Sequence, residues 1–185
     1  MIAAVVLAAG RGTRFGGQKL LLPLRGAPLL RRTVENVLAA GVAPLVVVMG
    51  PDLRPAIEGL PVQAVEIESE SMSASLRAGL RALPEVEGAF VCLGDQPGIA
   101  PETFRRLIES FRASGRPIAA PVYRGTRGNP VLFSRALFDE LCALGGDQGA
   151  RGLLAARPAD IVAVEIDAEM PLDVDTPGDY EALLR

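Results

Sequence analysis

The sequence of 185 residues contains no histidine, and only eight of its residues are aromatic: six phenylalanines and two tyrosines. The absence of histidine excludes Ser-His and Cys-His nucleophilic catalysis, histidine metal sites and acid–base catalysis by imidazole. Any catalysis by this chain must therefore use carboxylates, cations, backbone amides and metal ions.

Cysteine, positive charge and long apolar runs are also scarce. Cys92 and Cys142 lie far apart with no CxxC spacing, so we expect core residues rather than a disulfide framework or a zinc site. The net charge of -3 lacks the basic excess of nucleic-acid-binding proteins. No later apolar run is long enough to cross a bilayer. A signal peptide has a basic residue before its apolar core, and the apolar start MIAAVVLAAG has none. We interpret it as a buried strand. We expect a cytoplasmic protein without nucleic-acid or membrane partners.

Short apolar runs alternate with amphipathic segments along the chain. Six runs have the pattern of strands buried on both faces: 2–7, 44–49, 62–67, 88–93, 117–122 and 160–166. Three stripes have helical spacing: Leu29, Leu30, Val34, Val37 and Leu38; Leu76, Leu80 and Leu83; and Phe104, Leu107, Ile108 and Phe111. This alternation predicts a doubly wound, three-layer α/β/α fold with a mostly parallel sheet.

The hydrophobic fraction of 49% is enough for one substantial core, so we expect a single domain over residues 1–185. The region 123–152 breaks the alternation, and we expect it to be loop-rich and to face a substrate. Ligands of such folds bind beyond the carboxyl ends of the strands. The loops at 8–18, 68–75 and 94–100 should therefore converge.

The stretch LAAGRGTRFGGQKLLLPL, residues 7–24, is rich in glycine and positive charge. It does not match the P-loop, because Lys19 is followed by Leu20 rather than a hydroxyl residue and the glycine spacing differs. It also fails the dinucleotide pattern GxGxxG, because Phe15 stands at the third glycine position. Either this loop wraps a triphosphate with backbone amides, Arg14 and Lys19, or it is a solvated surface loop. Composition alone favours neither alternative.

Six segments resemble, in order, the motifs of the MobA-like nucleotidyltransferases, and in particular the molybdenum cofactor cytidylyltransferases. They are LAAGRGTRFGGQKLLLPLRGAPLL (7–30), SMSASLRAGL (71–80), GDQP (94–97), RGNPVLF (127–133), GGDQGARG (145–152) and DVDTPGDY (173–180). The resemblance implies a Rossmann-like nucleotidyltransferase fold and transfer of CMP from CTP to the terminal phosphate of the molybdenum cofactor. It also implies Mg²⁺ as cofactor, and a molybdenum hydroxylase of the xanthine dehydrogenase class, or its chaperone, as a transient partner.

The resemblance also implies a nucleotide site, made by Leu7, Ala8, Ala9, Gly10, Gly12, Arg14, Lys19, Ser75 and Leu76. Arg14 would bind the β- and γ-phosphates, and Lys19 the α-phosphate and the acceptor phosphate. Guanylyl-transferring relatives more often have glycine where Ala9 stands, which favours CTP over GTP. Serines at a helix start usually cap it, so we expect Ser73 or Ser75 to do so.

Three aspartates are candidate magnesium ligands. Asp95 follows a predicted central strand and would face the crevice, where one or two carboxylates with substrate phosphates suit Mg²⁺; otherwise it turns the chain or caps a helix. By resemblance Asp95 joins Arg14 and Lys19 as a catalytic residue. Asp173 and Asp175 stand two residues apart in an expected extended segment, so both should project to the same side. Asp175 or Thr176 is also suited to cap the helix that begins near Pro177, and both roles can hold at once, with Thr176 as the cap and one aspartate on the metal. Which of the two aspartates binds metal stays open.

Candidate acceptor residues lie in two glycine-containing polar loops. Asn129, Asp147 and Arg151 are either acceptor contacts or parts of surface turns; the resemblance favours acceptor binding for Asn129 and leaves Asp147 and Arg151 open. Other functions remain: transfer with GTP or to a sugar 1-phosphate, a cofactor-carrying maturation chaperone, or a dinucleotide-dependent redox enzyme.

Overall fold

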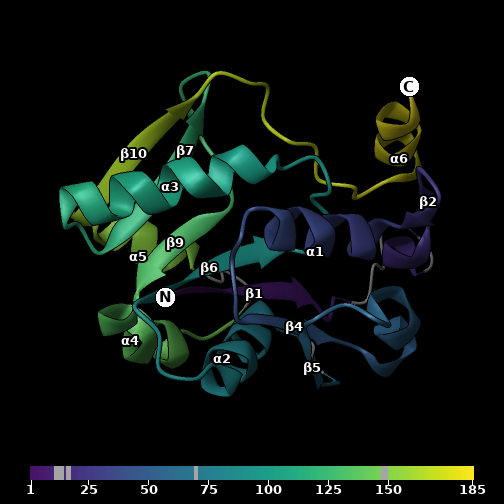
Figure 1. Cartoon of the computed structure of the whole chain (residues 1–185), viewed down its shortest axis with the longest axis horizontal. Helices are drawn as coiled ribbons and strands as arrows, with labels where there is room; N and C mark the ends of the chain where they lie inside the picture. Colours follow the sequence, from purple (N-terminus) through teal and green to yellow (C-terminus); the bar gives the residue numbers. More distant parts are fainter. Residues whose placement is uncertain (11–14, 16–17, 69–70, 147–149) are drawn as a thin grey trace.

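A computed structural model of the chain describes residues 1–10, 15, 18–68, 71–146 and 150–185. Its centre is an eight-stranded sheet with the order β10-β7-β9-β6-β1-β4-β5, in which β8 pairs with β7 (Figure 1). The strands are β1 (Ile2–Ala8), β4 (Leu45–Met49), β5 (Gln63–Glu66), β6 (Gly88–Leu93), β7 (Ile118–Tyr123), β8 (Thr126–Arg127), β9 (Val131–Ser134) and β10 (Ile161–Ile166). A separate hairpin joins β2 (Pro23–Leu24) to β3 (Ala27–Pro28). All six predicted strands are confirmed, but β5 and β10, at the two ends of the sheet order, have exposed residues and are not buried on both faces.

The sheet is mostly parallel, as predicted, with two exceptions: β9 inside the sheet, and the short β8, which is antiparallel to β7. β1 lies parallel to both β4 and β6, and β10 parallel to β7. β9 is antiparallel to both of its neighbours, β6 and β7. This strand comes from the region 123–152 that was expected to be loop-rich. Its apolar run is only Val131–Phe133, between Pro130 and Ser134, which is too short to stand out in the sequence.

Helices cover both faces of the sheet. The helices are α1 (Leu29–Ala39), α2 (Met72–Ala82), α3 (Pro101–Ser114), α4 (Phe138–Ala143), α5 (Arg151–Ala156) and α6 (Pro177–Leu184). Short 3-10 segments occupy Lys19–Leu21, Pro51–Ile57, Arg135–Leu137 and Pro158–Asp160. The three predicted apolar stripes lie on α1, α2 and α3, and Leu83 directly follows α2. In Figure 1, α1 and α3 lie on one side of the sheet and α2 and α4 on the other.

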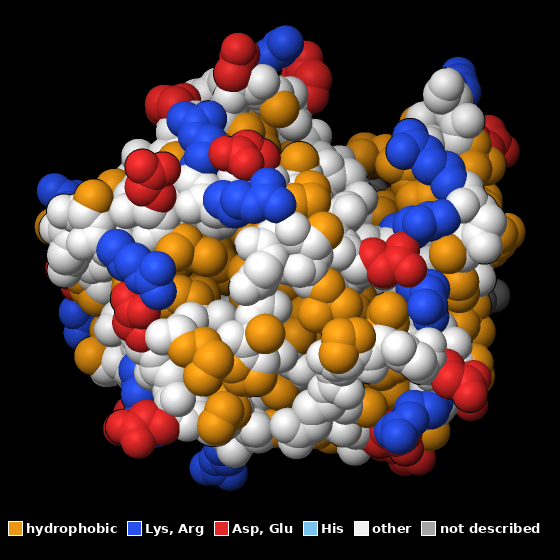
Figure 2. Space-filling view, viewed as in Figure 1, with side chains coloured by type: hydrophobic (Ala, Val, Ile, Leu, Met, Phe, Trp, Pro, Cys, Tyr) orange, Lys and Arg blue, Asp and Glu red, His pale blue; other side chains and the backbone are white. Residues whose placement is uncertain are grey.

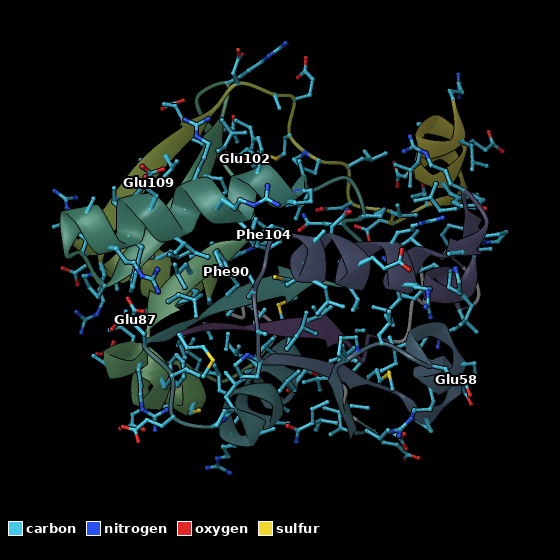
Figure 3. The ribbon with its side chains drawn as sticks, viewed as in Figure 1. Glu58, Glu87, Phe90, Glu102, Phe104 and Glu109 are labelled. Carbon is cyan, nitrogen blue, oxygen red and sulfur yellow. The ribbon has the colours of Figure 1, made fainter. Side chains whose placement is uncertain are left out.

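Alternate residues of β1 feed the two halves of the core. Ala4 and Val6 pack in the layer with α1 and α3, whereas Ala3 and Val5 pack in the layer with α2, α4 and α5. In the first layer, Phe104 of α3 meets Phe90 of β6 edge to face, with ring centroids 5.1 Å apart (Figure 3). The predicted three-layer α/β/α architecture is confirmed, and it brings the carboxyl ends of β1, β4 and β6 to one edge.

The surface agrees with the charge balance of the sequence. Figure 2 shows acidic and basic side chains interspersed on the visible face, and the view is hollowed between α6 and the part of the molecule that carries α3. In the part of the chain that the structure describes, no helix combines the length and the apolar character needed to cross a membrane.

Candidate nucleotidyl-transfer site

The carboxyl ends of β1 and β6 touch each other. The amide of Gly94 donates a hydrogen bond of 2.9 Å to the carbonyl of Leu7. A Cβ atom on Gly94 would lie 3.1 Å from the Cβ of Ala8 and 3.2 Å from the carbonyl oxygen of Leu7, so glycine permits this close approach. The predicted nucleotide residues at the end of β1 therefore lie beside the GDQP turn, with Leu7 and Ala8 buried, Ala9 half-buried and Gly10 exposed.

Two side chains of α1 hold the GDQP turn from the other side. The buried hydroxyl of Thr33 donates to the carbonyl of Gly94 over 2.9 Å, and the amide of Asn36 donates to the carbonyl of Pro97 over 2.8 Å. Sequence analysis missed both residues. The available signal was that they stand beside the apolar stripe of α1, where a polar residue needs a partner.

Lys19 joins the two acidic motifs. Its ammonium group donates to Asp95 Oδ2 over 2.7 Å and to Asp175 Oδ1 over 3.0 Å. The side chains of Lys19 and Asp95 are only 12% and 19% exposed, so solvent screens this ion pair weakly. The structure thus brings together three predicted site residues that are up to 156 positions apart in the sequence. We call Lys19, Asp95 and Asp175 the ion-pair cluster.

Burial and charge act together on the ion-pair cluster. Burial raises the pKa of Asp95 above its ordinary value; the Lys19 ammonium opposes this shift, while the carboxylates of Asp173 and Asp175 add to it. For Lys19, burial alone would lower the pKa, but the contacts with Asp95 and Asp175 outweigh it and raise the pKa. Lys19 is therefore a cation at neutral pH, available to bind anionic oxygens.

Asp173 and Asp175 bind different partners, although both carboxylates lie near enough to Asp95 to raise its pKa. Asp175 binds Lys19, whereas Asp173 Oδ1 accepts a hydrogen bond from the side-chain amide of Gln96. The backbone explains the difference, because the amide of Asp175 donates to the carbonyl of Asp173 over 3.1 Å. This bond closes a three-residue turn around Val174. The expectation of an extended segment is wrong at Val174, where this turn forms; that both carboxylates project to one side stays a prediction.

The helix after this turn begins as the sequence indicates. Thr176 caps α6, its hydroxyl accepting from the amide of Asp179 over 3.2 Å. In return, Asp179 Oδ2 accepts from the amides of Thr176 and Asp175. Asp179 therefore completes a capping box and also holds the backbone of Asp175.

Asp95 and Asp175 fit a divalent cation better than Asp173 does. Both carboxylates already face one positive charge, the Lys19 ammonium, and oxygen ligands are those that Mg²⁺ prefers. Within the described ranges, no group of three or more Asp, Glu or Cys side chains is placed to hold a metal ion. Two carboxylates with substrate phosphates would still suit Mg²⁺, which keeps few protein ligands. The assignment of these aspartates as metal ligands stays a prediction.

The serine motif begins α2 differently from expectation. The cap is Ser71, whose hydroxyl accepts from the amide of Ala74 over 3.2 Å, rather than Ser73 or Ser75. Ser75 is buried and donates to the carbonyl of Ser71, and Leu76 is fully buried. The roles of Ser75 and Leu76 in base binding stay predictions.

Two of the candidate acceptor residues lie within the described residues, and Asn129 comes just before β9, whose first residue, Val131, pairs with Val91 of β6. Asn129 is half-buried, and its carbonyl accepts a hydrogen bond of 2.9 Å from the phenol of Tyr123. Arg151 is exposed at the first residue of α5. Gly12, Arg14 and Asp147 lie outside the described residues.

Known proteins resemble this chain over most of its length. Residues 4–161 match the MobA-like NTP transferase domain. Nicotine blue oxidoreductase of Paenarthrobacter nicotinovorans is 32% identical, with 95% of this chain and 92% of that protein covered. A probable molybdenum cofactor guanylyltransferase of Thermococcus gammatolerans is 34% identical, with 65% of this chain and 62% of that protein covered.

Solved structures agree with the sequence comparison. The crystal structure of Rv0371c from Mycobacterium tuberculosis H37Rv has a TM-score of 0.89 and 37% identity, covering 99% of this chain and 97% of that one. A complex of Rv0371c with manganese has a TM-score of 0.86, 36% identity and the same coverage. Together with the strand-end site, these matches show that the chain belongs to the MobA-like NTP transferase family, a family of nucleotidyltransferases.

Proposed function

We propose that this protein transfers CMP from CTP to the terminal phosphate of a molybdopterin-type molybdenum cofactor and releases pyrophosphate. The observation that carries the proposal is the ion-pair cluster, in which one cation and two carboxylates meet at the end of β1 and β6. Phosphoryl transfer depends mainly on positioning and on neutralising phosphate charge, and this cluster supplies groups for both.

In the proposed reaction, an acceptor phosphate oxygen attacks the α-phosphorus of CTP. A new phosphoanhydride bond forms, the bond between the α- and β-phosphates breaks, and pyrophosphate leaves with the electron pair. The acceptor is already an anion at neutral pH and needs no general base, which fits a chain without histidine. The Lys19 ammonium would bind the α-phosphate and the acceptor, and Arg14 the β- and γ-phosphates.

Asp95 and Asp175 are proposed to hold a divalent ion, Mg²⁺. When bound, the ion would neutralise charge on the phosphates. The manganese complex of Rv0371c supports a divalent ion in a related protein. We further propose that Asn129, Asp147 and Arg151 contact the acceptor, and that the product passes to a molybdenum hydroxylase.

The choice of CTP over GTP rests on Ala9. Ala9 is half-buried beside the GDQP turn, and its methyl group would crowd a base edge that glycine would admit. Ser75 and Leu76, buried at the start of α2, are the other proposed base contacts. A relative named as a probable guanylyltransferase makes GTP the nucleotide to compare.

The decisive experiment measures pyrophosphate release with Mg²⁺ and the molybdenum cofactor, using CTP, GTP and ATP in parallel. We expect acceptor-dependent release that prefers CTP and falls on the order of 10³-fold in Asp95→Asn, because the variant loses a carboxylate proposed to hold the ion that neutralises the phosphates. Asp139→Asn, an exposed carboxylate change on α4, is the matched control and should stay active. Release that needs no acceptor, or that survives in Asp95→Asn, would contradict the proposal.

A redox activity is the second candidate, because nicotine blue oxidoreductase is 32% identical over 95% of this chain. The failed GxGxxG pattern of residues 10–15 argues against a dinucleotide-dependent reaction. We expect no oxidation of NADH or NADPH in the presence of a quinoid dye. Oxidation with no pyrophosphate release from any nucleotide would favour this second function.

A further inference from the structure

Gln96 is a buried polar residue beside the ion-pair cluster, and the reaction described above does not use it. The residue is 5% exposed and directly follows Asp95. Its side-chain nitrogen donates to Asp173 Oδ1, while its Oε1 atom is buried without a hydrogen-bond partner among the described residues. Burying an amide for one hydrogen bond costs free energy, so this contact calls for a physical reason.

The reason lies in the segment that Gln96 holds. The chain from Asp167 to Thr176, drawn in yellow between β10 and α6 in Figure 1, forms neither helix nor strand. It is fixed by a few contacts: the buried side chain of Val174, and a hydrogen bond of 3.2 Å from the amide of Val174 to the carbonyl of Asp95. Asp179 holds the carboxyl-terminal side of this short turn.

The contact with Gln96 holds the amino-terminal side of the same turn. Asp173 binds Gln96, the bond between the Asp175 amide and the Asp173 carbonyl closes the turn, and Asp175 binds Lys19. Without the amide of Gln96, the amino-terminal side of the turn around Val174 loses its side-chain anchor. The position of Asp175 therefore depends on a side chain that does not touch it.

We propose that Gln96 is a positioning residue, which binds Asp173 to fix the turn at Val174 and so places Asp175 beside Lys19 and Asp95. The importance of this placement for nucleotidyl transfer rests on the proposed function. The placement itself does not, so it is tested without turnover. Asp173 is assigned to this positioning contact rather than to a metal.

A single reporter is built into the chain, because Lys19 is its only lysine. Protein labelled with ¹³C at lysine Cε gives one lysine signal, whose position reports the contacts of the Lys19 ammonium. We expect Gln96→Leu, which keeps side-chain size and removes the donor, to move this signal toward that of Asp175→Asn. Gln63→Leu, an exposed change on β5, is the matched control and should leave the signal in place. A folded Gln96→Leu with an unmoved signal would overturn the proposal.

A charge-conserving exchange separates positioning from metal binding and also serves if Gln96→Leu fails to fold. The single variant Gln96→Glu places two carboxylates next to each other, and they repel. We therefore expect the Lys19 signal to move and the binding of Mn²⁺, without nucleotide, to weaken about 10-fold, as measured by electron paramagnetic resonance. The double variant, Gln96→Glu with Asp173→Asn, rebuilds the hydrogen bond with the donor at position 173 and the acceptor at position 96. It should restore both the signal and the Mn²⁺ affinity. A double variant that restores the signal but not the affinity would mean that Asp173 is itself a ligand, and would overturn its assignment.

These readouts also keep the two proposals apart. A protein that releases no pyrophosphate from any nucleotide, but whose Lys19 signal responds to Gln96→Leu and recovers in the double variant, loses the proposed function and keeps the positioning role. A protein that transfers CMP while its Lys19 signal ignores Gln96 loses the positioning role and keeps the function.

Discussion

The ion-pair cluster and the region 123–152 use their polar groups in opposite ways. In the cluster, Lys19, Asp95 and Asp175 come from distant parts of the chain and face one another. In the region 123–152, the phenol of Tyr123 donates a hydrogen bond to the nearby carbonyl of Asn129. Arg151 is exposed, and the apolar residues of β9 lie in the core. One region therefore concentrates charged side chains, while the other combines a strand of the core with loops whose contact with an acceptor stays a prediction.

The largest expected effect tests the first side of this comparison. Lys19→Met keeps an unbranched side chain but removes the cation, so phosphate charge would be unneutralised and two carboxylates would repel each other. We expect pyrophosphate release to fall on the order of 10⁴-fold, as for the loss of a cation on transferred phosphates. Steady-state and single-turnover kinetics measure the change.

Arginine provides the matched control for that variant. Lys19→Arg keeps the charge but replaces a compact ammonium with a planar fork, which does not fit between Asp95 and Asp175 at 2.7 and 3.0 Å. We expect only partial recovery. Activity close to that of the unchanged protein in Lys19→Met would mean that the cluster is structural, like the polar contacts of the region 123–152.

The second prediction tests whether β9 belongs to the core rather than to an insertion. Phe133 is fully buried between β6 and β7, where a loop-rich insertion would carry little stability. We expect Phe133→Ala to lower the free energy of unfolding by about 3–5 kcal/mol. Urea unfolding followed by circular dichroism measures this, and Leu172→Ala, at a side chain 40% exposed, should cost less than about 0.5 kcal/mol. Equal and small decreases in the free energy of unfolding of both variants would mean that the region is an insertion outside the core.

Much of the fold could be predicted from the sequence, because strands buried on both faces and helices with one apolar stripe differ in period. β9 could not be predicted, since three apolar residues next to a proline have no readable period. Lys19 and Asp95 could be predicted as site residues, because they follow a glycine-rich loop and an apolar run; Asp175 was predicted only together with Asp173, without a choice between them.

The contacts around the site were not predictable, because they depend on three-dimensional neighbours. The direction of Asp173 is set by a turn and by Gln96, and no spacing in the sequence records either. Thr33 and Asn36 resemble ordinary polar positions of an amphipathic helix until the GDQP turn is seen to lie against them. Charged residues of a site are thus easier to recognise in a sequence than the neutral residues that orient them.

The smallest expected effect tests the local contact of the second region. Burial raises the pKa of Tyr123 from 10.0 to about 12, and its phenol donates to the carbonyl of Asn129. Tyr123→Phe should lower the free energy of unfolding at neutral pH by about 1 kcal/mol, because that carbonyl loses its donor. It should also remove the absorbance step near pH 12 at 295 nm, which Tyr180→Phe should leave unchanged.

The sign of the pH dependence follows from the direction of this shift. Because folding raises the pKa of Tyr123, the stability that its neutral phenol contributes is fully present below about pH 10 and is lost as pH rises toward 12. The difference in unfolding free energy between the unchanged protein and Tyr123→Phe should therefore be constant from pH 7 to 9 and shrink above pH 10. A constant difference up to pH 12 would mean that the phenol is open to solvent. The Asn129 loop would then lack the buried anchor that distinguishes it from the charge-paired site.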